Sequence, residues 1–487
     1  MKLSTAVAVG LASAMGVSAA DEKVIGTFIF GRHGDRTAKP NGELTPVGIQ
    51  QVVEAGNFYH NRYFNDSSDY HIESLNETYQ SKQVTAASPG GSVLQKSQQG
   101  FLQGFYPPLD KLDVSDDTVT GSSLSNGSTM GTPLDNYQYV VTSTFEEETP
   151  NAIKITGVDG CKNFEKASDA YFESEEFKKL NKSTLDFYQG LYPLVEGILN
   201  KSELNFGKAY TVFDKMLVNN VHNETFSKKL KDHQDDFDQV RFLQDQYTKG
   251  LNYNSSNEDT ILGGKSLIGA IYSALNETKT TGKPLVTYYA GSYNVFYQVF
   301  AVLGLFDYDE STFTGLVNYA STFAFELVEK DNKQYVRFGL RNGTESTNQG
   351  IGKDPESPGF ETYPIFGEKD KLIPYSTWES KVKDKAINDL NGWCNACGSW
   401  DLQMCIPYSK DYLKAKEHDF NINTSSLSLA GAGGIGAGVT IGVFALIGAL
   451  AFLLCARKRK TDKSVPPMSE AKASNSYTSS VRTTNSV

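Results

Sequence analysis

Cysteine, histidine and positive charge are all scarce in this sequence of 487 residues. Five cysteines are too few for a fold held together mainly by disulfides, and the six histidines lack the spacing of a metal site, so no metal or cofactor is expected. Lys and Arg number 46 against 57 Asp and Glu, which argues against a nucleic-acid partner because such a partner needs a basic face. Hydrophobic residues, in contrast, make up 39% of the chain and aromatic residues 12%, enough for the packed interior of a globular protein.

The N-terminus has the features of a secretory signal. Residues 1–20 begin with Lys2, continue as an apolar stretch and end in small residues before Asp21 and Glu22, which predicts a cleaved signal peptide. Ten Asn-X-Ser/Thr acceptors for N-glycosylation lie between this signal and an apolar run near the C-terminus: Asn65, Asn76, Asn126, Asn181, Asn200, Asn223, Asn254, Asn276, Asn342 and Asn423. Their number and placement support passage through the secretory pathway.

A second apolar segment lies near the C-terminus. Residues 427–456 carry no charge, and we predict a transmembrane helix over 429–456, since about 20 apolar residues cross a hydrocarbon core of about 30 Å. The basic residues 457–460 follow at once and favour the cytoplasmic side. The sequence therefore predicts a single-pass protein of the plasma membrane or another secretory-pathway membrane, with its ectodomain outside and a cytoplasmic tail over 457–487. Three glycines in the predicted span recur every four residues and form a face through which two copies could pair as a homodimer: Gly434, Gly438 and Gly442.

Four cysteines precede the predicted span: Cys161, Cys394, Cys397 and Cys405. In an oxidising compartment we expect them to form two disulfides, for which three pairings exist. As an alternative, Cys394 and Cys397 could form half of a zinc site, but no nearby histidine completes a set of four ligands. Two disulfides are therefore the prediction, and their pairing stays open.

The mature chain opens with a strand that ends in basic residues. Residues 24–30 are apolar, β-branched or aromatic, as in a strand buried on both faces of an α/β sheet, and the run Arg-His-Gly-Asp-Arg over 32–36 follows. Ligands of open α/β sheets bind beyond the carboxyl ends of the strands. Arg32 and Arg36 offer forked donors for phosphate oxygens, and His33 is a nucleophile that can carry a phosphoryl group. The alternative is that His33 caps a turn while both arginines pair with surface carboxylates.

With this loop the sequence resembles the histidine acid phosphatases, the phytase-containing branch of the histidine phosphatase superfamily. Further similar segments follow in the family's order, at 44–50, 97–107, 261–267 and around Trp393. The resemblance implies an α/β fold with a three-layer core like that of phosphoglycerate mutase and an inserted, mostly helical cap. We expect the core, with its closing segment and a membrane stalk, over 21–107 and 258–426, and the cap over 108–257.

The resemblance also implies a two-step reaction. The histidine attacks phosphorus to give phosphohistidine, and water then hydrolyses this intermediate. Arg32, His33 and Arg36 match the family's loop residue by residue, so the resemblance assigns catalysis to His33 and phosphate binding to both arginines.

Three other family positions are degenerate in this chain. The family's third phosphate-binding arginine falls on Val93, and its His-Asp pair, whose aspartate protonates the leaving oxygen, falls on Ser292 and Tyr293. Serine carries no positive charge, and a tyrosine with an unperturbed pKa of about 10 is a poor acid at low pH. Asp35, at the variable position of the loop, is an alternative acid. Two lysines could supply charge in place of the third arginine, without its forked geometry: Lys82 and Lys96.

Two functions follow from these observations. The first is an acid-phosphatase-type hydrolase of phosphomonoesters, acting on the extracytoplasmic side of a membrane. The second is a catalytically impaired relative that binds a phosphorylated ligand or serves as a cell-surface protein. Loss of a general acid lowers a rate by about 10²- to 10⁴-fold, but a good leaving group needs no protonation. Aryl phosphates or anhydrides could therefore still react.

Overall fold

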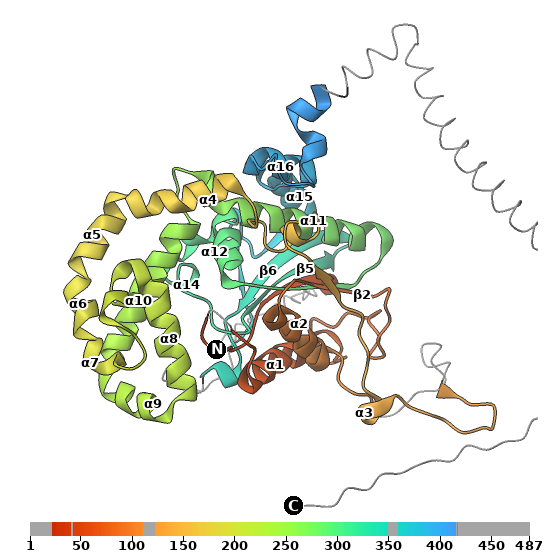
Figure 1. Ribbon diagram of the computed structural model, residues 1–487. Helices are drawn as coiled ribbons and strands as arrows, with labels where there is room; N and C mark the ends of the chain where they lie inside the picture. Colours follow the sequence, from red (N-terminus) through yellow and green to blue (C-terminus); the bar gives the residue numbers. More distant parts are fainter. Residues whose placement is uncertain (1–21, 40–41, 111–121, 349–358, 415, 417–487) are drawn as a thin grey trace, which may run out of the picture. The chain divides into compact units, whose positions relative to one another are not determined.

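The computed structural model describes most of the chain before the predicted membrane span (Figure 1). The described residues are 22–39, 42–110, 122–348, 359–414 and 416. The chain divides into two units, Met1–Ser409 and Lys410–Val487. The sheet and the helices named below belong to the first unit. The predicted signal peptide, span and tail lie outside the described residues. Within the described ranges, no helix is both long enough and apolar enough to cross a membrane.

A mixed eight-stranded sheet has the order β3-β2-β4-β1-β5-β6-β7, with β8 paired to β6. Its strands are β1 (Lys23–Arg32), β2 (Val84–Pro89), β3 (Ser143–Phe145), β4 (Val286–Gly291), β5 (Thr322–Lys330), β6 (Lys333–Arg341), β7 (Glu361–Tyr363) and β8 (Leu372–Pro374). The strands β1 to β4 run parallel, whereas β5 pairs antiparallel with β1 and begins an antiparallel half. β1 carries no charged residue between Lys23 and Arg32, so it can lie buried at the centre of the sheet.

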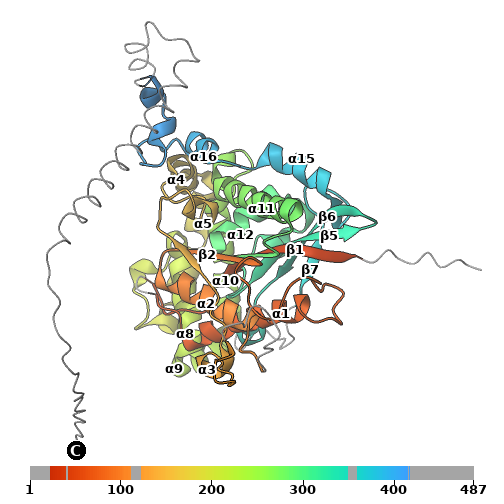
Figure 2. The same cartoon turned by 90° about the vertical axis from the view of Figure 1, so that its right-hand side faces the viewer.

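Helices cover both faces of this sheet (Figure 2). The helices of the two layers are α1 (Pro46–Tyr63) and α2 (Ser92–Phe105) on one face, and α11 (Leu262–Thr281), α12 (Tyr293–Val302) and α15 (Tyr375–Lys385) on the other. Tyr59 of α1 is buried in one cluster with Ile29 of β1. On the other face, the ring of Phe296 in α12 meets that of Phe30 in β1 at a centroid distance of 5.4 Å. The expected α/β class is therefore confirmed.

A mostly helical segment connects α2 to α11. Its helices are α3 (Pro133–Asn136), α4 (Lys162–Asp169), α5 (Glu175–Ser183), α6 (Leu185–Gly190), α7 (Tyr192–Val195), α8 (Ala209–His222), α9 (Glu224–Leu230) and α10 (Gln234–Asn252). Phe213 of α8 and Val240 of α10 are buried in the same cluster as Phe296, so this segment shares a hydrophobic core with the sheet. The strand β3 of this segment pairs with β2 and extends the sheet.

The remaining helices lie towards the C-terminal part of the first unit: α13 (Leu305–Tyr308), α14 (Glu310–Phe313) and α16 (Leu390–Cys397). Two disulfides tie α16 to its surroundings, Cys161–Cys397 and Cys394–Cys405. Trp393 is buried among these cysteines and donates a hydrogen bond from Nε1 to the carbonyl of Gly157 at 2.9 Å. Because Cys394 and Cys397 bond to different partners, they do not act together as zinc ligands.

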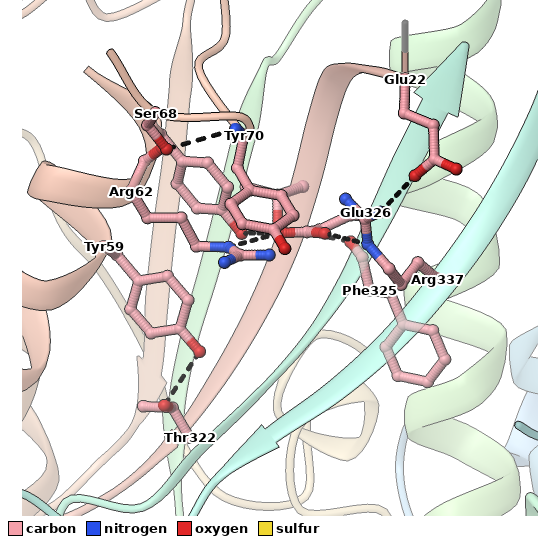
Figure 3. Close-up of polar contacts among 11 residues, drawn as sticks. Glu22, Tyr59, Arg62, Ser68, Tyr70, Thr322, Phe325, Glu326 and Arg337 are labelled. Atoms are coloured by element: carbon pink, nitrogen blue, oxygen red, sulfur yellow. Dashed lines mark hydrogen bonds and ion pairs between the residues drawn. The ribbon is translucent and has the colours of Figure 1, made fainter. Parts of the chain in front are cut away.

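A buried ion cluster joins α1 to the antiparallel half of the sheet (Figure 3). Glu326 of β5 is 0% exposed and accepts hydrogen bonds from Nε of Arg62 and Nε of Arg337, each at 2.7 Å. The hydroxyl of Tyr63 donates to the same carboxylate at 2.9 Å. Burial alone would raise the pKa of Glu326, but the two arginines hold it below its ordinary value. The carboxylate is therefore charged and satisfied on both oxygens.

Removing the charge of Glu326 should destabilise the fold strongly. In Glu326→Gln two buried guanidinium groups lose their common partner, and breaking a buried ion pair in this way costs about 3–5 kcal/mol. Urea unfolding measures this loss, and Glu329→Gln, a partly exposed position on the same strand, serves as the control and should change stability by less than about 0.5 kcal/mol. Equal unfolding midpoints for the two variants would show that the cluster does not stabilise the protein.

Candidate active site

Backbone hydrogen bonds hold the end of β1 on both sides. β4 runs parallel to β1 and aligns Gly291 with Arg32, and the N–H of His33 donates to the carbonyl of Gly291 at 3.2 Å. On the other side, the N–H of Ala320 donates to the carbonyl of His33 at 3.1 Å. The loop 32–36 therefore leaves the sheet beside the carboxyl ends of two parallel strands, the edge at which open α/β sheets bind ligands.

Two glycines let this loop pack directly against α1. A Cβ atom on Gly34 would lie 2.2 Å from the carbonyl oxygen of Gly48, and one on Gly48 would lie 2.1 Å from that of Asp35, so neither position has room for a side chain. On α2, the hydroxyl of Ser97 accepts from the N–H of Gly34 at 3.3 Å and donates to the carbonyl of Val93 at 2.7 Å. The first turns of α1 and α2 thus support the loop.

The ring of His33 is held in one tautomer. The side chain is nearly buried, and Nδ1 lies 2.8 Å from the carbonyl oxygen of Gly34. Because a carbonyl only accepts, Nδ1 carries the proton, and Nε2 of the neutral ring keeps its lone pair. Burial lowers the pKa of His33 well below 6.5, and the charge of Arg32 lowers it further. The ring is therefore neutral in mildly acidic solution.

Arg32 lies between two aromatic rings. Its guanidinium carbon is 4.4 Å from the ring centroid of Tyr319 and 5.2 Å from that of Tyr293, distances at which cation–π attraction offsets part of the lost hydration. Nη1 donates to the carbonyl of Val317. The buried Nε of Arg32 has no hydrogen-bond partner among the described residues. One donor of this side chain is thus left for an anion.

Arg36 forms a forked pair with Asp214 of α8. Nη2 lies 2.8 Å from Oδ1 and Nη1 lies 3.4 Å from Oδ2, and the two side chains are 4% and 8% exposed. Nη2 also donates to the hydroxyl of Tyr210 at 2.9 Å. Burial tends to lower the pKa of Arg36, but Tyr319, Tyr210 and Asp214 together raise it above its ordinary value. Arg36 is therefore charged and paired.

Asp35 is also held by α8. Its Oδ2 accepts from the hydroxyl of Thr45 at 2.5 Å and lies 2.7 Å from Nε2 of His222. Tyr210, Asp214 and His222 are spaced by four and eight residues, which places all three on one face of the helix. One helix of the inserted segment thus contacts two successive residues of the loop.

Lys39 is a further cation at this site. It lowers the pKa of His33 together with the two loop arginines, and burial lowers its own pKa. A cavity of about 340 Å³ is lined by Lys39, Tyr210 and Tyr293 with residues of α4 and α10. Tyr210 accepts a hydrogen bond from Arg36, Tyr293 lies beside Arg32, and the charges of both arginines lower the pKa of Lys39 further. The cavity therefore opens next to the cationic loop.

The segment 39–341 matches the sequence profile described as "Histidine phosphatase superfamily (branch 2)". This match covers more than half of the chain. The protein belongs to the histidine phosphatase superfamily, branch 2. The match begins at Lys39, three residues beyond the loop, so it does not include Arg32, His33 or Arg36.

Solved structures of this superfamily share the fold. The chain is similar to the phytase from Citrobacter braakii, with a TM-score of 0.52 and 13% identity over 77% of this chain and 99% of that one. It is also similar to the apo form of Hafnia alvei phytase, with a TM-score of 0.51 and 14% identity over 78% and 98%. At such low identity these likenesses concern the fold alone. No curated protein sequence matches this chain.

The three positions that the sequence predicts to be degenerate lie around the loop. Val93 is half-buried in the first turn of α2 and meets the loop through Ser97. Ser292 directly follows β4, and the ring of Tyr293 stacks on that of Tyr210 at 5.6 Å beside Arg32. Burial, and then the neighbouring Tyr210, raise the pKa of Tyr293 well above 10, which makes this hydroxyl a still weaker acid than expected.

The other candidates from the sequence are two lysines on the surface and Asp35 within the loop. Lys82 is exposed, and Lys96 pairs with Glu43 at 2.7 Å on the surface. Asp35 is 1% exposed and engaged by Thr45 and by a histidine of α8.

Sequence reasoning missed the contributions of Lys39 and α8. Lys39 lies three residues beyond the loop and was visible as a nearby cation. For α8, the i, i+4, i+12 spacing of polar residues on an otherwise buried helix was the available signal.

Proposed function

We propose that this protein is a phosphomonoester hydrolase of acid-phosphatase type that works through a phosphohistidine intermediate on His33. The state of the imidazole carries this proposal. Nδ1 is committed to the carbonyl of Gly34, Nε2 keeps a lone pair, and the lowered pKa keeps the ring nucleophilic at acidic pH. The alternative, that His33 only caps a turn, does not account for the several cations beside it.

In the proposed reaction, Nε2 of His33 attacks phosphorus and the P–O bond to the leaving group breaks. Arg32, Arg36 and Lys39 offset the negative charge that accumulates on the phosphoryl oxygens. Water then attacks the phosphohistidine and the P–N bond breaks. Inorganic phosphate is released, and the neutral imidazole is regenerated. Every step uses side chains of this chain and water alone.

The leaving group determines which esters react. No carboxylic acid stands at Ser292 or Tyr293, and the raised pKa of Tyr293 makes it a weak proton donor. We therefore propose phosphorylated small molecules with good leaving groups, such as aryl phosphates, as the substrates. The phytases of similar fold support a small phosphorylated ligand in general.

A second function is binding of a phosphorylated ligand without turnover. The Arg36–Asp214 pair favours this alternative because it occupies one of the two loop arginines. The missing acid pair favours it as well. The two functions can be distinguished experimentally, because only turnover forms the covalent phosphoenzyme.

We also propose that the active site faces the extracytoplasmic side of a membrane, with the chain anchored by the predicted helix over 429–456. The glycosylation acceptors support this orientation. Of the nine acceptor asparagines that the structure describes, six are exposed, three are partly exposed and none is buried. The two disulfides fit an oxidising compartment.

Replacement of the nucleophile tests the proposed function. The purified full-length protein, mixed rapidly with 4-nitrophenyl phosphate at pH 5 and quenched with alkali, should give a burst of nitrophenol and an alkali-stable phosphoprotein. His33→Ala should give neither, because the proposed nucleophile is gone, whereas the exposed His233→Ala should behave as the wild type. A burst that persists in His33→Ala contradicts the mechanism, and phosphate binding without any burst leaves the second function.

Restoring the superfamily's acid pair should change the choice of substrate. In Ser292→His/Tyr293→Asp a carboxyl group stands beside the leaving oxygen, so hydrolysis of glycerol phosphate should rise by about 10²-fold or more. Hydrolysis of 4-nitrophenyl phosphate should change little, since its leaving group needs no proton. Steady-state rates on both esters give the ratio of glycerol phosphate hydrolysis to 4-nitrophenyl phosphate hydrolysis. Ser292→His alone is the control. An unchanged ratio would mean that protonation does not limit the reaction.

The proposed orientation predicts where glycans and proteases act. Full-length protein made in a eukaryotic host should shift to lower mass on treatment with an endoglycosidase. In sealed vesicles, protease added to the cytoplasmic side should remove only the tail over 457–487. Absence of glycans, or digestion of the sheet-bearing unit from the cytoplasmic side, contradicts the proposed location.

A further inference from the structure

The pairing of Arg36 with Asp214 resembles the binding of a ligand. A carboxylate presents two oxygens in one plane to the fork of a guanidinium group, as a phosphate group does. Both oxygens of Asp214 face Arg36, and both side chains are withdrawn from solvent. The fork of Arg36 has room for one such anion at a time.

The electrostatic balance of the site supports an exchange of anions. Three cations and two carboxylates meet at the loop, and they leave one net positive charge: Arg32, Arg36, Lys39, Asp35 and Asp214. If Asp214 turns away, the net charge rises to two and matches a phosphate dianion. Asp35 does not play this part, because its Oδ2 contacts Thr45 and His222 rather than the fork of an arginine.

Space and anchoring also favour movement of the side chain alone. The cavity of about 340 Å³ is lined by Tyr210 and Thr211, one helical turn before Asp214 on α8. His222, two turns further along, fixes the same helix to Asp35. The helix can therefore stay docked on the loop while the carboxylate of Asp214 leaves Arg36.

We propose that Asp214 is a specificity-determining residue: its carboxylate occupies the position on Arg36 that a substrate phosphate takes, and phosphate binds in exchange for it. This inference rests on the proposed function in that it concerns the same phosphate site. Weakly bound anions fail to displace the carboxylate. A phosphate dianion succeeds because Arg32, with its unpartnered Nε, and Lys39 bind it as well.

Asp214→Asn tests this exchange, with inorganic phosphate as the probe and isothermal calorimetry as the measurement. The full-length variant should bind phosphate about ten-fold more tightly than the wild type or better, because the competing charge is gone. Without phosphate its thermal midpoint should fall, since a buried guanidinium loses its partner, and phosphate should raise the midpoint more than in the wild type. A purely structural Asp214 would give the fall without the tighter binding.

Two control variants separate charge from contact. Tyr210→Phe removes a neutral partner of Arg36 and should not tighten phosphate binding, and the exposed Asp238→Asn should leave it unchanged. Equal or weaker phosphate binding by Asp214→Asn overturns the inference. The proposed function is judged separately by the phosphoenzyme, because phosphate binding requires no turnover.

If Asp214→Asn does not fold, a crystal structure of the wild type with phosphate provides the test. A crystal structure with phosphate oxygens on Arg36 and Asp214 displaced supports the exchange. A structure in which phosphate is bound and the Arg36–Asp214 pair is intact, or in which no phosphate reaches Arg36, overturns it.

Discussion

Positive charge buried at the end of β1 is the constraint on which the rest of this site depends. Arg32 and Arg36 are buried there with the more exposed Lys39 nearby, and an uncompensated buried charge costs several kcal/mol. Aromatic faces surround Arg32, and a carboxylate pairs with Arg36. His33 responds by giving up its own proton. The neutral nucleophile is thus a consequence of burial first and then of the same cations that are proposed to bind phosphate.

The compensating groups come from the helical segment rather than from the sheet. Tyr210, Asp214 and His222 all lie on one face of α8, and they contact two neighbouring residues of the loop. The loop by itself would carry an excess of positive charge, so the docking of α8 and the geometry of the loop stabilise each other. Changes in α8 can therefore alter the phosphate site without any change in the loop itself.

Local sequence predicted the parts of the site that are local in structure. The apolar strand, the basic loop at its carboxyl end and the α/β class follow from patterns within a few residues. The partner of Arg36 could not be predicted in this way, because Asp214 lies 178 residues further along the chain. The same holds for β3, which is three residues long and is identified only by its pairing with β2. Contacts between distant segments depend on tertiary packing, which no local pattern records.

The part of the chain that the structure describes holds two buried arginine–carboxylate clusters, and they differ in what happens when the pair separates. Glu326 lies on a central strand, is 0% exposed and binds a different arginine with each oxygen, so its release would leave a buried anion without a partner. Its lowered pKa means that its stabilising effect is complete above the ordinary value of 4.5 and is lost only as the pH falls through the lowered value. This cluster therefore holds the fold together in mildly acid solution.

Asp214 differs on each of these points. It lies on a helix of the inserted segment, one turn beyond residues that line a cavity, and both of its oxygens face the same arginine. When a phosphate group takes its place, Arg36 keeps an anionic partner. An arginine–carboxylate pair thus stabilises the core at Glu326, where no ligand can replace either partner. At Asp214, where a ligand can replace the carboxylate, the same kind of pair can regulate access to the loop.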